Sequence, residues 1–274
     1  AATSGGGGGG GGSVAAEPSV AARAKIDLAC FGGGPSVDVA KTPCSTIMSE
    51  RGVDVGWLRA WTEKHNLWDV STEDVVQLVI KPLTQHLGCR FVELESQVGA
   101  GGGGGSGSSA HSVVGPADAF ISHCWQCSFG NLVAAAADNS RPGRKVWVDV
   151  FAVNQHATMM ADLAGLSDVI RSVPEGLLLV ADAKAALNNK FLNPLKRIWC
   201  VFELVHALDG GKPIVIKLGE FAYNGTEGTP DERGVVWRRE WNKSQIEAMV
   251  EDVDVLGAEA TKQKDKDKII LVIL

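Results

Sequence analysis

Residues 193–210, NPLKRIWCVFELVHALDG, predict a long buried helix around which the rest of the chain is organised. Asn193 is a suitable N-cap, Pro194 suits the first helical position, and Gly210 is a typical helix stop. Most residues between these caps are apolar, and Glu203 is the one carboxylate well inside the stretch. An acid alone on a buried helix is either paired with a base or kept for a functional site.

The composition is that of a globular chain with two low-complexity segments. Of the 274 residues, 45% are hydrophobic and 21% are charged, which is enough to bury a sizeable core. The 33 glycines are not evenly spread, and two glycine-rich runs, at 5–12 and 99–109, cannot pack a core. We therefore expect mostly disordered residues at 1–50, a helical preface packed on the main domain at 51–98, a Gly/Ser-rich linker at 99–112, and an α/β domain at 113–274.

The charge pattern and the termini limit the class of protein. The net charge is −6 and no basic stripe is present, so nucleic acid is not an expected partner. The N-terminus lacks a signal-peptide pattern, and the longest apolar run, at 269–274, is too short to span a membrane. Six scattered cysteines indicate reduced thiols and a cytoplasmic protein. The first residue is not Met and the last six are apolar, so both ends are expected to be fragment ends.

The preface has two helical patterns and one alternating pattern. Residues 52–66 are amphipathic with a helical period. Ser71 has the pattern of an N-cap and opens a second helix over 71–80, which Pro82 should end or bend. Residues 89–95, CRFVELE, alternate in polarity and predict a strand.

After the second glycine run, apolar segments of strand length alternate with helical patterns. The predicted strands cover 118–122, 145–151, 176–181 and 213–218. The predicted helices between them cover 129–137, 162–173 and 193–209. Continuous apolar strands that alternate with helices indicate a parallel sheet covered on both faces.

These segments resemble, in order, the motifs of a Toll/interleukin-1 receptor (TIR) domain. DAFISH at 118–123 resembles the D-x-F-I-S box, and RIWCVFELVHAL at 197–208 resembles the helix with W-C-x-x-E-L. KVWVDVFAVNQ, GLLLVA and KPIVI lie between and after them in the family's order. The resemblance covers about 117–220, and the preface is similar to that of a divergent branch of the family. It implies a flavodoxin-like three-layer α/β/α fold with a parallel sheet of order 2-1-3-4-5.

In a sheet of that order, ligands bind where the strand order reverses, at the carboxyl ends of the first and third strands. The first strand ends at Ser122 and His123, and the third ends near Asp182. The helix that carries Glu203 follows the third strand and flanks the same crevice. Trp199 would support this site or pack against the sheet. The predicted substrate-binding residues are Ser122, His123, Trp125, Asp182 and Trp199.

The resemblance implies either cleavage of NAD⁺ or self-association in signalling. In the resembled family the glutamate of W-C-x-x-E-L holds the ribose and stabilises an oxocarbenium-like transition state, and it corresponds to Glu203. Nicotinamide leaves as a neutral group, so one carboxylate suffices and no general acid is needed. NAD⁺ is then a substrate, and neither a cofactor nor a metal is expected.

Two interpretations of the function stay open. In the first, the chain is a TIR-like signalling or interaction module that keeps NAD⁺ glycohydrolase activity through Glu203. In the second, it is a purely structural scaffold that associates with itself or with other TIR-like domains, and Glu203 pairs with Lys196 or Arg197. A helix that starts at Pro194 would place Glu203 about 13 Å along its axis, which is far from the crevice mouth.

Cys124 and Cys127 form a C-x-x-C pattern, a spacing that also occurs in redox and zinc sites. A second C-x-x-C is missing, so ordinary packed thiols are the favoured interpretation. Cys200 and His206 do not suit a nucleophile–base pair, because six residues of helix leave them about 120° apart.

Overall fold

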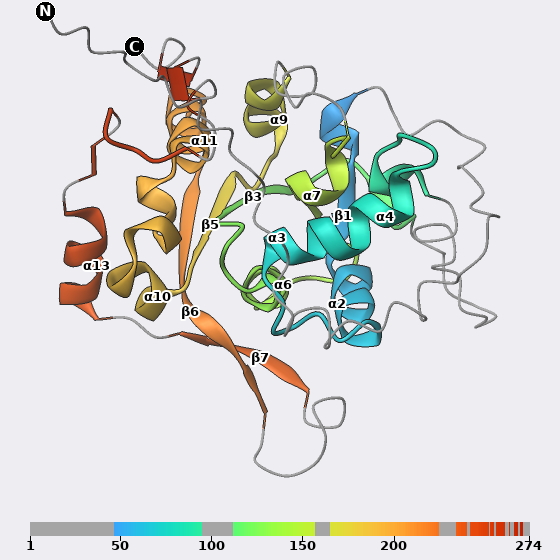
Figure 1. Ribbon diagram of the computed structural model, residues 1–274, viewed down its shortest axis with the longest axis horizontal. Coiled ribbons are helices and arrows are strands. Elements are labelled where there is room, and N and C mark those ends of the chain that lie inside the picture. Colours follow the sequence, from blue (N-terminus) through green and yellow to red (C-terminus); the bar gives the residue numbers. More distant parts are fainter. Residues whose placement is uncertain are drawn as a thin grey trace, which may run out of the picture.

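The computed structural model describes residues 47–94, 112–156, 165–224, 234–239, 242–251 and parts of 253–270. The two glycine runs lie outside the described residues, so the predictions made for them stay predictions. Figure 1 shows a twisted sheet with helices packed on both sides of it. In the described segments, no helix combines the length and the apolar character that crossing a bilayer requires.

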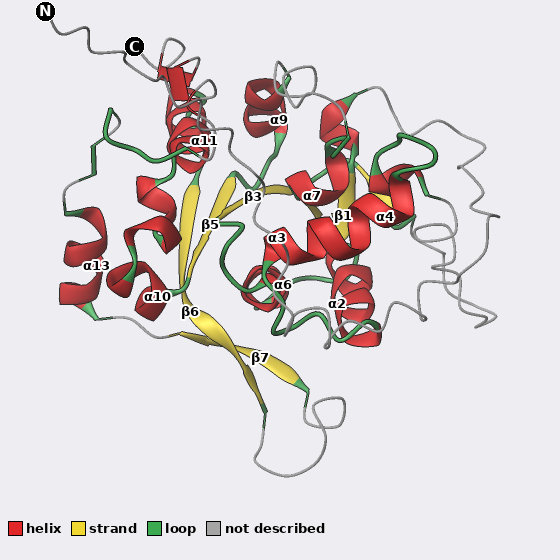
Figure 2. Ribbon diagram, in the orientation of Figure 1, coloured by secondary structure: helices red, strands yellow, loops and turns green. Residues whose placement is uncertain are grey.

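Within these segments, seven strands form one mixed sheet of order β2-β1-β4-β3-β5-β6-β7 (Figure 2). They are β1 (Gly52–Asp54), β2 (Val114–Gly115), β3 (Ala119–His123), β4 (Lys145–Trp147), β5 (Leu177–Ala181), β6 (Ile214–Tyr223) and β7 (Val235–Arg239). The pairs β4–β3, β3–β5 and β5–β6 are parallel, as predicted. The outer strands β1, β2 and β7 pair antiparallel, which differs from the expected all-parallel sheet. The α/β class is confirmed, and the sheet is mixed.

Two hydrophobic clusters lie on opposite faces of this sheet, because side chains alternate along each strand. Ile121 of β3 belongs to the cluster that holds α2 and α6, and Phe120 belongs to the cluster that holds α9 and α11. The α-helices are α2 (Val55–Lys64), α3 (Thr72–Val75), α4 (Lys81–Thr84), α6 (Phe129–Ala137), α7 (Asp149–Ala152), α9 (Leu166–Ser172), α10 (Ala183–Asn188), α11 (Ile198–Asp209) and α13 (Lys243–Val250). Shorter helical turns are η2 (Met48–Glu50), η3 (Val76–Ile80), η4 (Phe91–Glu93), η5 (Lys190–Leu192) and η6 (Pro194–Lys196).

The preface supplies both a strand of the sheet and part of the core. The predicted helix at 52–66 is wrong at its start, since β1 pairs with β2 and β4 before α2 begins. Asp54 ends that strand by accepting a hydrogen bond from the Trp57 amide at 2.9 Å. The ring of Trp61 then packs edge-on against Phe129 of α6, at 6.2 Å between centroids. The preface is thereby continuous with the α/β core.

Two further preface predictions are corrected. The strand at 89–95 is wrong: residues 91–93 form η4, because the Glu93 carboxylate accepts the Arg90 amide at 2.6 Å and favours a turn. The Ser71 hydroxyl accepts a hydrogen bond from the Asp74 amide at 3.0 Å, which confirms Ser71 as an N-cap. However, the helical run continues past Pro82 to the end of α4, with the wider π-helical turn η3 just before the proline.

The predicted strand at 145–151 holds only in its first half. β4 ends at Trp147, and Asp149 opens the short helix α7. The Asp149 carboxylate accepts the Val150 amide at 2.8 Å, so the side chain turns the backbone away from an extended path. Local hydrogen bonding here outweighs the strand propensity of the Val and Phe residues.

The helix predicted at 193–209 is broken in two. Residues 194–196 form the 3₁₀ turn η6, Arg197 is extended with φ −105°, and α11 starts at Ile198. Glu259 causes the break, because its carbonyl accepts the Ile198 amide at 2.9 Å and its amide donates to the Lys196 carbonyl at 2.8 Å. At 1.5 Å per residue, Glu203 is therefore about 8 Å from the start of α11.

Candidate functional site

Glu203 is carried by α11, which contacts β3, and its carboxyl lies near Ser122, at the carboxyl end of that strand. The residue is only 9% exposed. Burial raises the pKa of its carboxyl well above the usual value, the nearby Ser122 hydroxyl opposes this rise, and the charge of Asp149 adds to it. The Ser122 hydroxyl nevertheless makes no hydrogen bond of ordinary geometry. The protonated form of Glu203 is therefore favoured in the folded protein.

The basic partner that the scaffold interpretation requires is not observed. Across the described part of the chain, no Lys, Arg or His forms an ion pair with Glu203. Lys196 lies in η6, and Arg197 forms the extended link before α11. A buried acid without a base is costly, and such groups cluster at functional sites.

Asp149 is a second carboxyl at this site, and the sequence interpretation missed it. The Trp125 indole Nε1 donates to Asp149 Oδ2 at 2.7 Å. Burial raises the pKa of Asp149 to about 6, against the lowering effect of this hydrogen bond. The residue was assigned to the interior of a strand. The sequence did contain one signal for Asp149, because a carboxylate that directly follows an apolar strand bordering the crevice is a candidate site residue.

Of the two polar residues at the end of β3, only Ser122 faces Glu203. Ser122 shares a face with Phe120, on the side of α11, and its hydroxyl influences the pKa values of both Glu203 and Cys200. Alternation directs His123 to the opposite face. Burial lowers the pKa of His123 to about 3, so its imidazole is neutral. The Ser122 hydroxyl and the His123 Nε2 are buried without a hydrogen-bond partner among the described residues.

The remaining predicted site residues have structural contacts. Asp182 caps α10 by accepting the Ala185 amide at 2.8 Å, and it also accepts from Asn131 Nδ2 at 3.3 Å. Trp199 is partly buried, and its ring packs edge-on against Phe202 at 6.0 Å. Trp125, in contrast, reaches the site directly through its hydrogen bond to a carboxylate.

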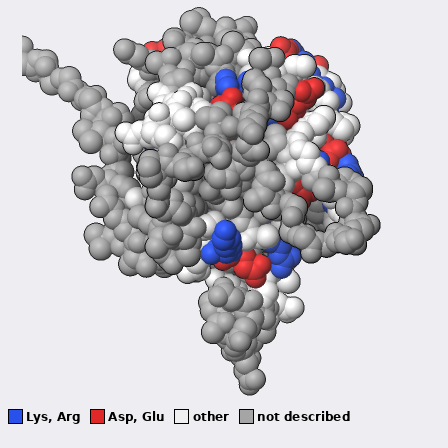
Figure 3. Space-filling model, turned by 90° about the vertical axis from the view of Figure 1, so that its right-hand side faces the viewer, with Lys and Arg blue, Asp and Glu red and all other residues white. Residues whose placement is uncertain are grey.

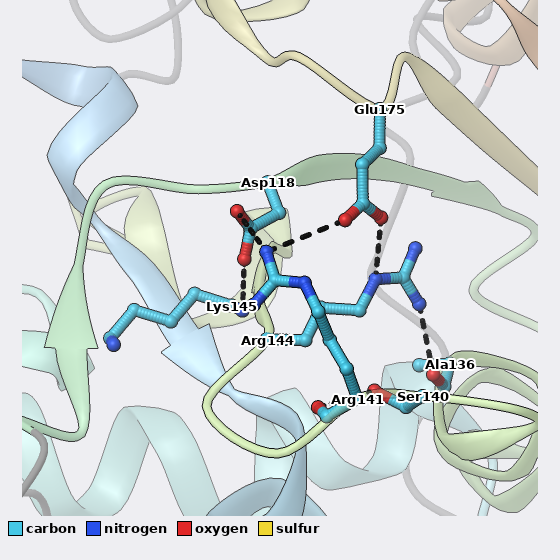
Figure 4. Close-up of polar contacts among 7 residues, drawn as sticks. All are labelled: Asp118, Ala136, Ser140, Arg141, Arg144, Lys145 and Glu175. Carbon is cyan, nitrogen blue, oxygen red and sulfur yellow. Dashed lines mark hydrogen bonds and ion pairs between the residues drawn. The ribbon is translucent and has the colours of Figure 1, made fainter.

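A second polar cluster lies at the other end of the sheet (Figure 4). Arg141 bonds Asp118 at 2.8 Å and Glu175 at 3.5 Å, and Arg144 bonds Glu175 at 2.7 Å. Asp118 also accepts the Lys145 amide at 2.8 Å. A pocket of about 410 Å³ opens beside these residues. Because the two arginines and the two carboxylates satisfy one another, this cluster ties strand ends together and offers no free charge to a ligand.

The described residues contain no group of three or more His, Cys, Asp or Glu side chains arranged to hold a metal ion. Among the described residues on the face shown in Figure 3, basic and acidic side chains are interspersed. A scan against models of known protein families finds no match, and comparisons with characterised proteins and with solved structures find none either. Fold and site together define an α/β protein in which two carboxyls with raised pKa values, those of Glu203 and Asp149, lie at one end of the parallel strands.

Asp149→Asn should stabilise the protein near neutral pH. The pKa of Asp149 rises from 3.8 to about 6 on folding. Between these pH values the folded state therefore binds more protons than the unfolded state. As a result, the stability of the wild type falls as pH rises from about 4 to 6. Asn removes this loss, and its single oxygen keeps one of the two hydrogen bonds that the carboxylate accepts from Trp125 Nε1 and the Val150 amide. We expect a gain of about 1–2 kcal/mol at pH 7, less than the full shift implies, because Asp149 keeps partial exposure.

Denaturant unfolding at pH 4 and pH 7 measures this effect. Asp168→Asn, at an exposed position on α9, is the matched control and should leave the pH dependence unchanged. Identical pH profiles for Asp149→Asn and the wild type would show that Asp149 ionises freely in the folded protein.

Proposed function

We propose that the chain is a TIR-like signalling module and that Glu203 acts in hydrolysis of the nicotinamide N-glycosidic bond of NAD⁺. The observation that supports this best is a buried carboxyl with no basic partner among the described residues. A second carboxyl, that of Asp149, is electrostatically coupled to it. The parallel neighbours β4, β3, β5 and β6 also agree with the first four positions of the order 2-1-3-4-5.

The proposed chemistry requires that the Glu203 carboxyl lose its proton when the positively charged substrate binds. NAD⁺ carries a positive charge on its nicotinamide ring, and the charge moves toward the anomeric carbon as the bond breaks. A cation beside two coupled carboxyls favours their ionised forms, so substrate binding would release a proton. Glu203 then stabilises the developing oxocarbenium ion, and the unbonded Ser122 hydroxyl is available to a ribose hydroxyl.

Burial adds one requirement to this proposal. Glu203 is 9% exposed, so the substrate reaches it only after α11 and the turn after β3 move apart. Closing the site again would exclude water from the ion formed at the ribose. Activity should therefore depend on conditions that promote such opening, such as assembly at high protein concentration.

The proposed reaction is tested by incubating the concentrated protein with NAD⁺ and separating nicotinamide and ADP-ribose by liquid chromatography. We expect release of both products in equal amounts. Glu175→Gln, which alters a carboxylate at the opposite end of the sheet, should release nicotinamide at the wild-type rate. Intact NAD⁺ after prolonged incubation of assembled protein would overturn the proposal.

The second candidate is a self-association scaffold without catalysis. Val215 and Ile216 of β6 are 46% and 48% exposed, which is unusual for apolar residues of a strand. They line a groove of about 370 Å³ together with Met249 and Val250 of α13. Sedimentation velocity of the same preparation separates the candidates, because a scaffold forms oligomers and leaves NAD⁺ intact.

A further inference from the structure

Cys124 and Cys127 lie in the turn that joins β3 to α6. The Cys127 amide donates to the Cys124 carbonyl at 2.9 Å, which closes a four-residue turn. Such a turn holds its first and last Cα atoms within about 7 Å, and a disulfide requires about 4.4–6.8 Å. The Cys124 and Cys127 sulfurs also face the same segment, since they lie 3.2 Å and 3.7 Å from the carbonyl oxygens of Phe191 and Leu192.

We propose that Cys124 and Cys127 are a redox-active dithiol that forms a reversible disulfide when a small peroxide oxidises it. The inference is independent of the NAD⁺ proposal, because neither sulfur is needed for cleavage of a glycosidic bond. Both residues are free thiols in this structure. The fold keeps them paired through backbone geometry, whereas packed thiols need only fill space.

The surroundings of Cys124 favour its thiolate. The neighbouring Cys127 thiol lowers the pKa of Cys124 to about 7, with help from the Gln126 amide and Arg197, and burial opposes this effect. The Cys124 sulfur and burial together raise the pKa of Cys127. A thiolate paired with a protonated thiol is the state from which reactive C-x-x-C pairs act, and here the pair lies in the turn before α6.

The oxidation balances with one molecule of hydrogen peroxide. The Cys124 thiolate attacks one peroxide oxygen, the O–O bond breaks, and the departing hydroxide is protonated to water, which leaves a sulfenic acid on Cys124. The Cys127 sulfur then attacks the Cys124 sulfur, an S–S bond forms, and hydroxide leaves with the Cys127 proton as a second water. The two thiols lose two electrons, and the peroxide gains them.

Oxidation also changes the contacts of the segment before α11. The Cys124 thiol lies 3.2 Å from the Phe191 carbonyl, and the Cys127 thiol lies 3.7 Å from the Leu192 carbonyl. A disulfide has no S–H, so both donors to η5 are lost when it forms. We expect amide hydrogen exchange around η5 to become faster on oxidation and to return on reduction.

The test follows each cysteine by mass spectrometry after the full chain is treated with hydrogen peroxide. Trypsin yields a peptide of residues 91–144, which contains Cys124 and Cys127 and no other cysteine, and Cys200 falls in the peptide 198–217. Disulfide formation removes two hydrogens from peptide 91–144, and we expect this loss to be at least about tenfold faster than the oxidation of Cys89. Cys89 is the slower thiol because burial raises its pKa. Dithiothreitol should restore both thiols.

Two variants test the order of attack. In Cys127→Ser the resolving thiol is absent, so dimedone should trap a sulfenic acid on Cys124, and the wild type should give at least about tenfold less of this adduct. In Cys124→Ser, Cys127 should oxidise no faster than Cys89. Free thiols in peptide 91–144 after Cys89 has been oxidised, or a bond that joins this peptide to 198–217, would overturn the proposal.

Discussion

Glu203→Gln is expected to lower the rate of nicotinamide release by about 100- to 1000-fold, as when other preorganised electrostatic stabilisers are removed. Gln keeps the shape and the hydrogen-bonding capacity of the side chain, and it cannot acquire the negative charge that stabilises an oxocarbenium ion. Nicotinamide release at saturating NAD⁺ measures the loss. The KM for NAD⁺ should change far less than kcat, because the charge acts mainly in the transition state.

The same variant should not be destabilised. The pKa of Glu203 is higher in the folded than in the unfolded state, so wild-type stability falls as pH rises from the unfolded value of 4.5 toward the folded value, and Gln lacks this loss. Thermal unfolding at pH 7 should therefore show a melting temperature equal to or above that of the wild type. A loss of about 3–5 kcal/mol would instead mean that a basic partner had been stranded, as a buried ion pair predicts.

Gly176→Ala is expected to cost about 3 kcal/mol or more in free energy of unfolding. Gly176 has φ +79°, and a Cβ added there would lie 2.1 Å from the Pro213 carbonyl oxygen. That oxygen accepts the Leu177 amide, and the Gly176 carbonyl accepts the Phe120 amide. The substitution therefore forces apart the starts of β3, β5 and β6, which denaturant unfolding should register as a large shift of the midpoint.

Gly211→Ala is the matched control for this crowding. Gly211 has a similar φ of +61°, and a Cβ there would meet nothing within 4 Å. It should cost only the backbone strain of a left-handed residue, about 1–2 kcal/mol. Equal losses in free energy of unfolding for the two variants would show that the backbone at Pro213 can shift at little cost. The close approach at Gly176 would then contribute little to stability.

Strand positions could be predicted from the sequence because they depend on runs of apolar residues. β5 coincides with a segment that is apolar throughout, and β3 and the start of β6 coincide with segments that are mostly apolar. A strand covered on both faces requires such a run. The position of Glu203 on a buried helix near the crevice followed from the same kind of pattern. A lone acid among apolar residues is visible in the sequence whatever the register of its neighbours.

Tertiary contacts decided the features that local patterns could not. The break before α11 depends on Glu259, which lies 62 residues beyond Arg197, so no local window contains its cause. Asp149 lies at the site because its own side chain ends β4 and because Trp125 reaches it from another loop. The antiparallel strand β1 pairs with β2 and β4, which both lie far along the chain from it.

The sequence by itself determined which segments are buried, and hence the α/β class, because burial follows from composition and periodicity. Only the tertiary structure decided which polar groups face one another. It directs Ser122 toward Glu203 and His123 away from it, since adjacent strand residues point to opposite faces. It also places two cysteines of a common spacing at the two ends of one tight turn. Charge and proton affinity at a site depend on such neighbours, and contacts across the fold set them.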